Sequence, residues 1–136
     1  MKKMLFVGLL IAIALSACSG GGSSVSIDGQ WKLVSYGSSS DQKPALPDVE
    51  TSIEFGSDGQ LSGNVGCNSF GGDYKVKGNT MEFGPIMTTE MYCEAVAEQE
   101  SGTYAVLQGS VTFMLDGNTL TITSADGNSS IVLERK

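Results

Sequence analysis

Few side chains in this 136-residue chain can carry out acid–base or nucleophilic chemistry. The sequence contains no histidine, which excludes Ser-His-Asp and Cys-His catalytic sites and every histidine-ligated metal. Thr88, Thr89 and Tyr92 place hydroxyl groups close together, but no base stands near them in the sequence to activate a nucleophile. We therefore expect no enzyme activity, no catalytic residue and no cofactor.

Carboxylates are the remaining side chains that could bind a metal ion or a charged partner. Glu90, Glu94 and Glu98 recur every four residues, so a regular helix would place them on one face. Such a stripe could bind a divalent cation or a basic partner, but hard cations need ligands that converge from more than one segment. We favour a solvated acidic face and expect no metal. The Asp-Gly-Asn segments lack the residue order of calcium loops and are interpreted as turns.

The N-terminus has the three-part layout of a secretory signal. Lys2 and Lys3 are basic, residues 4–15 are almost wholly apolar, and small residues follow up to Cys18. Twelve apolar residues are fewer than the roughly 20 that a transmembrane helix needs. Residues 1–17 are therefore predicted to be a signal peptide. The alternative is a buried helix of the domain, which is disfavoured because no polar residues recur with a helical period.

The residues around Cys18 extend this interpretation. Leu15-Ser16-Ala17-Cys18 resembles the lipobox of bacterial lipoproteins, and the resemblance implies cleavage before Cys18 and lipidation of its sulfur and new amino group. Several acyl chains would anchor the protein firmly in a membrane. Residues 18–27 then form the lipidated start and a flexible Gly/Ser tether. By the sorting rule that the resemblance brings, Ser19 favours the outer over the inner membrane.

Removal of the signal peptide makes the protein more acidic. The whole chain carries a net charge of −7. The mature chain, residues 18–136, keeps all 15 acidic residues but only six of the eight basic ones, which gives −9. Nucleic acid and anionic lipid headgroups would repel such a domain. We expect no nucleic-acid partner, and contact with the membrane through the lipid on Cys18.

Cys67 and Cys93 remain once Cys18 is assigned to the anchor. An even pair of cysteines in a small exported domain is most simply one disulfide. In the chain-entropy model, closing that loop stabilises the fold by about 3.5 kcal/mol. The alternative is a redox pair or half of a metal site, but the spacing is not Cys-x-x-Cys, and two thiolates without histidine make a poor zinc site.

The mature sequence favours a mostly antiparallel β structure. Apolar residues alternate with polar ones in short runs, and Gly-containing turns separate the runs, which is typical of strands with one buried face. Asp-Gly and Gly-Asn supply the positive φ angles of tight hairpins. The last three strands should form a meander. Eight strands are predicted, at residues 29–36, 51–55, 60–65, 72–77, 80–84, 111–115, 119–123 and 129–134.

One segment, residues 89–108, lacks the alternation and is rich in Ala, Glu, Gln and Leu. It is predicted to be a helix, capped at its start by Thr88 or Thr89 and weakened or broken at Gly102. Its apolar face would consist of Cys93, Val96, Ala97, Tyr104 and Leu107. The expected fold is α+β, an antiparallel twisted sheet or partly open barrel of about eight short strands with one helix packed on it.

A family resemblance rests on an ordered set of motifs. Gly66-Cys67-Asn68, Thr89-x-Met91-x-Cys93 and the hairpin from Asp116 to Ile122 resemble the META domain of the heat-shock HslJ type, as do the opening Trp31-Lys32-Leu33 and Glu98-Gln99-Glu100. We assign this domain to residues 28–136. The resemblance implies an α+β domain often found on exported bacterial proteins, without established enzymatic activity and associated with stress and drug tolerance. Gly102 departs from the family pattern, in which the helix continues.

Asn68 lies beside the predicted disulfide and, together with Phe70, Tyr74 and Met91, forms the candidate binding surface. For Asn68 a structural role in a turn is the favoured alternative. We predict a non-catalytic envelope lipoprotein module that binds another envelope protein or supports envelope integrity under stress. The rival prediction is a carrier that holds a small apolar ligand in a half-open barrel.

The lipid anchor is directly testable. The variant Cys18→Ser removes the sulfur that the lipobox resemblance identifies as the acylation site, so the protein should leave the membrane fraction or stay unprocessed. Fractionation of cell envelopes together with the intact mass of the protein measures this. Membrane retention and an unchanged lipidated mass in the variant would refute the assignment.

Overall fold

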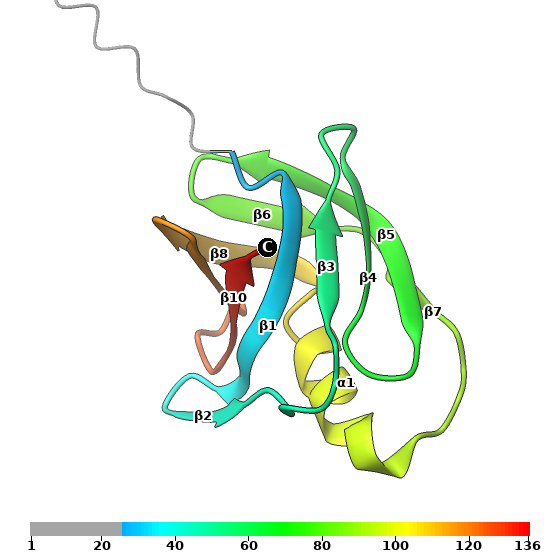
Figure 1. Cartoon of the computed structure of the whole chain (residues 1–136). Helices are drawn as coiled ribbons and strands as arrows, with labels where there is room; N and C mark the ends of the chain where they lie inside the picture. The colour runs from blue at the N-terminus through cyan, green and yellow to red at the C-terminus, as the bar shows by residue number, and fades with distance from the viewer. Residues whose placement is uncertain (1–25) are drawn as a thin grey trace, which may run out of the picture.

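A computed structural model describes residues 26–136. The predicted signal peptide, Cys18 and residues 18–25 of the predicted tether lie outside these residues. The described chain forms one antiparallel sheet in the order β10-β9-β8-β6-β5-β4-β3-β1-β2, which also pairs β10 with β1. This pairing closes eight strands into a barrel (Figure 1). The strands are β1 Gly29–Ser38, β2 Asp41–Pro44, β3 Ser52–Phe55, β4 Gln60–Asn64, β5 Ser69–Lys77, β6 Thr80–Phe83, β7 Met87–Thr88, β8 Gly109–Asp116, β9 Thr119–Thr123 and β10 Ser129–Arg135.

The predicted fold class is confirmed, and the barrel is closed rather than partly open. All eight predicted strands are present, and β8, β9 and β10 form the expected meander. Two short strands were not predicted: β2 pairs only with β1, and β7 pairs only with β5. Closure depends on β1, which pairs with β10 along most of its length, from Trp31↔Arg135 to Ser38↔Ser129.

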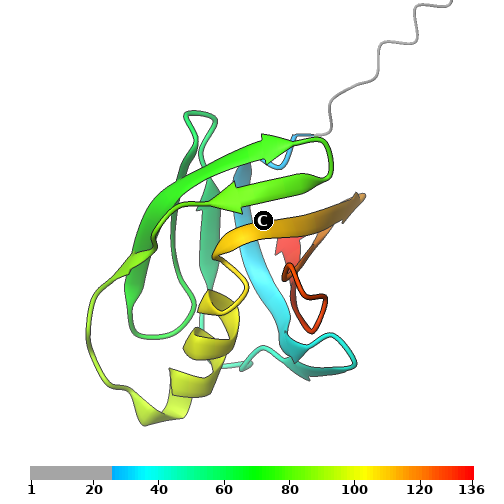
Figure 2. The same ribbon diagram turned by 180° about the vertical axis from the view of Figure 1, so that it is seen from behind.

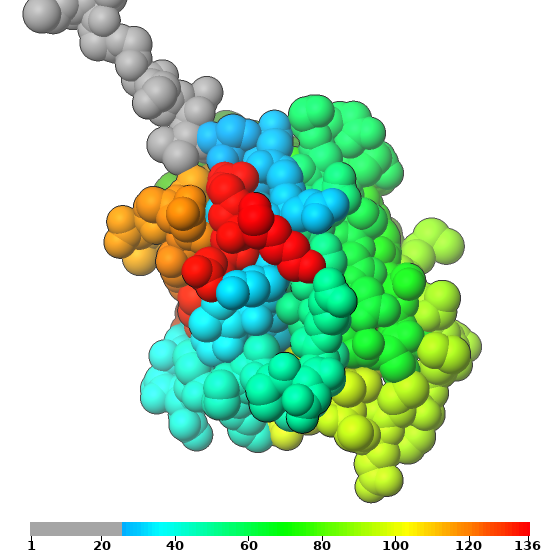
Figure 3. Space-filling view, in the orientation of Figure 1, coloured from blue at the N-terminus to red at the C-terminus, as the bar shows by residue number. Residues whose placement is uncertain are grey.

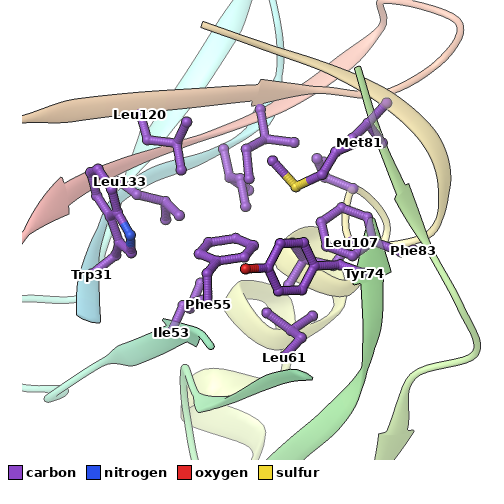
Figure 4. Packing of buried hydrophobic residues seen from close by; sticks show 14 of the residues in the cluster. Trp31, Ile53, Phe55, Leu61, Tyr74, Met81, Phe83, Leu107, Leu120 and Leu133 are labelled. Atoms are coloured by element: carbon purple, nitrogen blue, oxygen red, sulfur yellow. The ribbon is translucent and has the colours of Figure 1, made fainter. Parts of the chain in front are cut away.

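The alternating pattern of the strands becomes the inside and outside of the barrel. Phe55 packs edge-on against Tyr74 with ring centroids 5.1 Å apart, and the ring centroid of Phe83 lies 6.5 Å from that of Phe55. Figure 4 shows these side chains filling the interior between opposite walls. The fully buried apolar side chains include Trp31, Ile53, Phe55, Leu61, Val65, Met81, Leu107, Leu120, Ile122, Ile131 and Leu133.

The tight turns between strands have the conformation that their residues predict. Gly117 connects β8 to β9 with a φ of 59°, which is the left-handed region that glycine adopts without steric cost. The two strands that this turn joins stay in register from Thr112↔Thr123 to Asp116↔Thr119. The local turn therefore sets the pairing of the meander.

The helix is shorter than predicted and begins later. A 3-10 turn, Glu94–Val96, leads into α1, Ala97–Tyr104, which lies across one end of the barrel (Figure 2). Neither the 3-10 turn nor α1 has a side-chain hydrogen bond at its N-cap, so the predicted capping by Thr88 or Thr89 is wrong. Both threonines instead lie where the chain runs along β5. No helix within residues 26–136 is both long enough and apolar enough to cross a membrane.

The predicted apolar face of the helix is also wrong. α1 buries the polar residues Gln99, Glu100 and Thr103. Of the predicted residues, Val96 and Leu107 are buried, and they lie before and after α1. The physical reason is that α1 covers an end of the barrel, where loop backbone groups need hydrogen-bond partners.

Gly102 marks a close approach rather than a break in the helix. A Cβ atom at this position would lie 2.6 Å from Cδ2 of Tyr36, a buried side chain of β1. The helix can therefore pack on β1 only if position 102 has no side chain.

The variant Gly102→Ala should reverse the usual helix preference. Alanine normally stabilises a helix interior by about 0.5–1 kcal/mol relative to glycine, but here overpacking against Tyr36 should lower the free energy of unfolding by about 1–3 kcal/mol. Denaturant unfolding measures the difference. Ser101→Ala, at the exposed neighbouring position, is the matched control and should be close to neutral. A stabilised Gly102→Ala would contradict this packing.

Candidate functional site

The turn between β4 and β5 is built around a buried carboxylate. Glu100 of α1 is 6% exposed, and its Oε1 accepts hydrogen bonds from the backbone N–H groups of Cys67 (2.9 Å) and Asn68 (2.6 Å). Its Oε2 accepts a third bond from Nδ2 of Asn68 (2.9 Å). A Cβ atom on Gly66 would lie 2.5 Å from Cγ of Glu100. Position 66 must therefore be glycine for the carboxylate to reach the turn.

Gln99 satisfies backbone groups on two other segments. Its Oε1 accepts a bond from the N–H of Leu46 (2.8 Å), and its Nε2 donates to the carbonyl of Val65 (2.6 Å). Gln99 is fully buried, with 1% exposure. Buried amide and carboxylate groups are stable only when bonded in this way. Together, Gln99 and Glu100 dock the helix on the end of the barrel through polar contacts.

Asn68 transmits this docking to the segment that follows β6. Its Oδ1 accepts bonds from the N–H of Met91 (2.8 Å) and the hydroxyl of Thr89 (2.9 Å), and its Nδ2 donates to the carbonyl of Met91 (2.8 Å). The amide therefore pairs with the Met91 backbone as a neighbouring strand would. A structural role was favoured for Asn68, and its side chain does satisfy backbone groups, but these belong to Met91 on the neighbouring segment and not to its own turn.

We call residues 85–93 the strap. This segment runs over the outside of the turn that contains Asn68 and is bonded to it and to β5 at several residues. Strand β7 pairs with Phe70 and Gly71 of β5, and the N–H of Thr89 donates to the carbonyl of Ser69 (3.0 Å). The Cys67–Cys93 disulfide closes the far end, with Cα atoms 6.4 Å apart. The predicted bridge is thus formed, and Cys93 precedes the 3-10 turn rather than lying within a helix.

The strap exposes large apolar side chains although its backbone is held in place. Residues 87–92 are exposed without interruption. Met87 is 78% exposed, Met91 57% and Tyr92 82%. In Figure 3 this yellow-green segment forms the margin of the molecule beside β5. Single exposed apolar residues are common, but a group of them on one short segment is typical of an interaction site.

The four residues of the predicted binding surface do not share a surface. Phe70 packs edge-on against Tyr104 with ring centroids 5.4 Å apart, and Tyr74 lies in the core. Asn68 is buried, and of the four only Met91 is exposed. The Tyr74 hydroxyl donates to the carbonyl of Gly56 (2.8 Å), and burial, reinforced by the charge of Asp28, raises the pKa of Tyr74 to about 12.

A second feature is an open groove of about 770 Å³ between the bend after β6 and the end of α1. Apolar groups of Phe83, Pro85, Ile86, Tyr104 and Ala105 line most of it. The Tyr104 hydroxyl is buried without a hydrogen-bond partner among the described residues. Burial, together with the nearby Glu100 charge, raises the pKa of Tyr104 to about 12, so this hydroxyl is protonated at neutral pH and can donate a hydrogen bond.

The predicted acidic stripe is not a single helical face. Glu90 lies on the strap, Glu94 lies in the 3-10 turn, and Glu98 lies in α1, where it pairs with Lys43. Residues 26–136 contain no group of three His, Cys, Asp or Glu side chains that could hold a metal ion. Sequence reasoning missed the importance of Glu100 and Gln99, because a strongly polar helix face is ordinarily interpreted as solvated.

Comparisons with known proteins identify the fold. A family model described as the META domain matches residues 24–136. Among solved structures, a protein from Burkholderia xenovorans determined by NMR is 20% identical, with a TM-score of 0.64 over 80% of this chain and 82% of the other. A DUF4847 family protein from Bacteroides vulgatus ATCC 8482 is 15% identical, with a TM-score of 0.59 over 80% and 93%. No curated protein matches the chain.

The variant Asn68→Ala should release the strap. It removes the partner of both Met91 backbone groups and of Thr89, so we expect a loss of about 2–4 kcal/mol in the free energy of unfolding, since buried polar groups remain unpaired. Amide hydrogen exchange should accelerate in residues 87–93 before it does in the barrel. Ser69→Ala, at the exposed next position, is the control and should leave both measurements nearly unchanged. Unaltered exchange in the strap of Asn68→Ala would show that the amide does not hold it.

Proposed function

The chain belongs to the META domain family, and from this premise we propose that it is a non-catalytic module of the bacterial envelope that binds another envelope protein and supports envelope integrity under stress. The observation that carries the proposal is the strap, where Met87, Met91 and Tyr92 are exposed on a backbone that Asn68 and the disulfide hold in place. Anchoring through a lipid on Cys18 is part of the proposal and rests on the lipobox resemblance.

The state of the barrel interior supports a binding surface over an internal ligand site. Trp31, Phe55, Phe83 and Met81 fill the space between the walls (Figure 4), and the large clefts of residues 26–136 open onto the outside. A carrier usually encloses most of its ligand in a pre-formed cavity. In this fold, recognition therefore falls to the outer surface. The stress role comes only from the family resemblance.

A small-ligand carrier is the second candidate, and one observation favours it. The groove beside α1 is mostly apolar, and a hydroxyl without a partner, that of Tyr104, lies buried beside it. An apolar ligand with a carbonyl or carboxylate group would suit such a groove, provided that a small shift of the ring exposed the hydroxyl. In this case the ligand would lie against the end of the barrel rather than inside it.

Crosslinking in intact envelopes distinguishes the two functions. We expect the wild-type protein to yield a crosslinked complex with a second protein, and the double variant Met91→Ser/Tyr92→Ser to reduce its yield about tenfold, because aromatic anchors dominate interface energies. The variant Ala105→Trp, which fills the groove, should retain the complex. Organic extraction of the purified protein, followed by mass spectrometry, searches for a bound small molecule. A ligand that is extracted from the wild type but absent from Ala105→Trp, with no protein complex, would support the carrier instead.

A further inference from the structure

The exposed apolar side chains of the strap lie in a part of the chain that has no positive charge. Residues 78–133 contain seven acidic residues and no Lys or Arg. Glu90 lies between Met87 and Met91 in the sequence, and Glu94 follows Tyr92 by two residues; both glutamates are exposed. Neither forms an ion pair with a residue that the structure describes. The apolar surface is therefore flanked by uncompensated negative charge.

Four of the six basic residues of the described chain have partners away from the strap. Lys32 pairs with Glu134 (2.9 Å), Lys43 pairs with Glu98, and Lys136 approaches Glu50 (3.8 Å). Arg135 lies 4.2 Å from the centroid of the Trp31 ring. Lys75 and Lys77 have no ion pair among the described residues, and they lie at the end of β5 that pairs with β6, whereas the strap pairs with Phe70 and Gly71 at its other end. A partner that covers the strap would have to supply its own cations to balance Glu90 and Glu94.

The strap is also organised in advance for binding. Both backbone groups of Met91 are bonded to Asn68, Thr89 is bonded to Ser69, and Cys93 is bridged to Cys67. A partner therefore meets side chains on an ordered backbone. Binding then costs little conformational entropy in the strap, because its backbone is already ordered. Two of the three exposed apolar side chains are methionines, a residue type that adapts readily to apolar partners of different shapes.

We propose that the strap docks a cationic, apolar segment of a partner protein, whose Lys or Arg side chains face Glu90 and Glu94 while its apolar side chains cover Met87, Met91 and Tyr92. This inference rests on the proposed function as a protein-binding module. Charge complementarity selects this partner. A second copy of this chain would bring the same acidic strap, and an anionic lipid surface would repel the glutamates.

The test places a photo-crosslinking residue on the strap of the full-length protein in intact envelopes. p-Benzoylphenylalanine in place of Tyr92, and separately in place of Met87, should crosslink to a protein on illumination, and mass spectrometry of the crosslinked peptide then identifies the contacted segment. We expect Lys or Arg together with apolar residues in that segment. The matched control is p-benzoylphenylalanine in place of Met114, an equally apolar side chain that is 66% exposed on β8. Figure 1 shows β8 and β7 on opposite sides of the molecule.

Charge variants test the electrostatic part. Glu90→Gln/Glu94→Gln should lower the crosslinking yield from position 92 by about two- to fivefold per charge, the range for exposed ion pairs. Raising the ionic strength should lower the wild-type yield in the same direction. The double variant Glu54→Gln/Asp116→Asn removes the same number of exposed charges away from the strap and should leave the yield unchanged.

The outcomes separate this inference from the proposed function. A crosslink from the strap to an acidic or uncharged segment, to lipid or to a second copy of this chain would overturn the cationic partner. A protein crosslink from Met114 but none from the strap would leave a protein-binding module that uses another surface. The absence of any protein crosslink from all three positions would contradict the inference and also weigh against the proposed function.

Discussion

The buried carboxylate of Glu100 connects the parts of the structure on which the proposed recognition depends. It accepts hydrogen bonds from the backbone of Cys67 and Asn68 and from the Asn68 side chain, and the same side chain holds Met91 on the strap. Helix, turn and strap are therefore linked through one polar network. Such a network is stable only while every member is bonded, because the low dielectric of the interior makes an unpaired group costly. The geometry of the exposed strap thus depends on a helix residue that lies below it.

Barrel closure has a functional consequence. Pairing β1 with β10 removes the two edges that an open sheet would expose, and the inward-facing side chains fill the space that closure creates. A filled eight-stranded barrel leaves the loops and the barrel ends as the places where a partner can bind. Here one end carries α1 and the groove, and the strap runs beside it. Both candidate functions therefore concern the same region of the molecule but different side chains.

The charge distribution and the predicted anchor are consistent with each other. A mature chain of net charge −9 would not adhere to an anionic membrane by its surface, so a lipid on Cys18 with a Gly/Ser tether would hold the domain near the membrane without orienting it. A tethered domain reaches its partners at high effective concentration. Weak contacts, such as those that we propose between the two methionines, Tyr92 and a cationic segment, would then be sufficient.

The sequence by itself determined the strands, their turns and the cysteine pair. Period-two alternation marks each strand, and glycines such as Gly117 mark the hairpins. Of the three cysteines, the two that remain once Cys18 is assigned to the anchor predict the bridge. It also indicated a structural role for Asn68, although not its partners on the strap. Only the tertiary structure decided that β1 meets β10, that β7 is a strand and that Phe70 and Tyr74 belong to the core. The tertiary structure likewise turned the polar face of α1 inward. Gln99 and Glu100 look solvated from their neighbours in the chain, and their partners, such as the backbone groups of Val65 and Cys67, lie more than 30 residues away. No local pattern records a hydrogen bond between such distant segments, and the location of the exposed strap follows from those bonds.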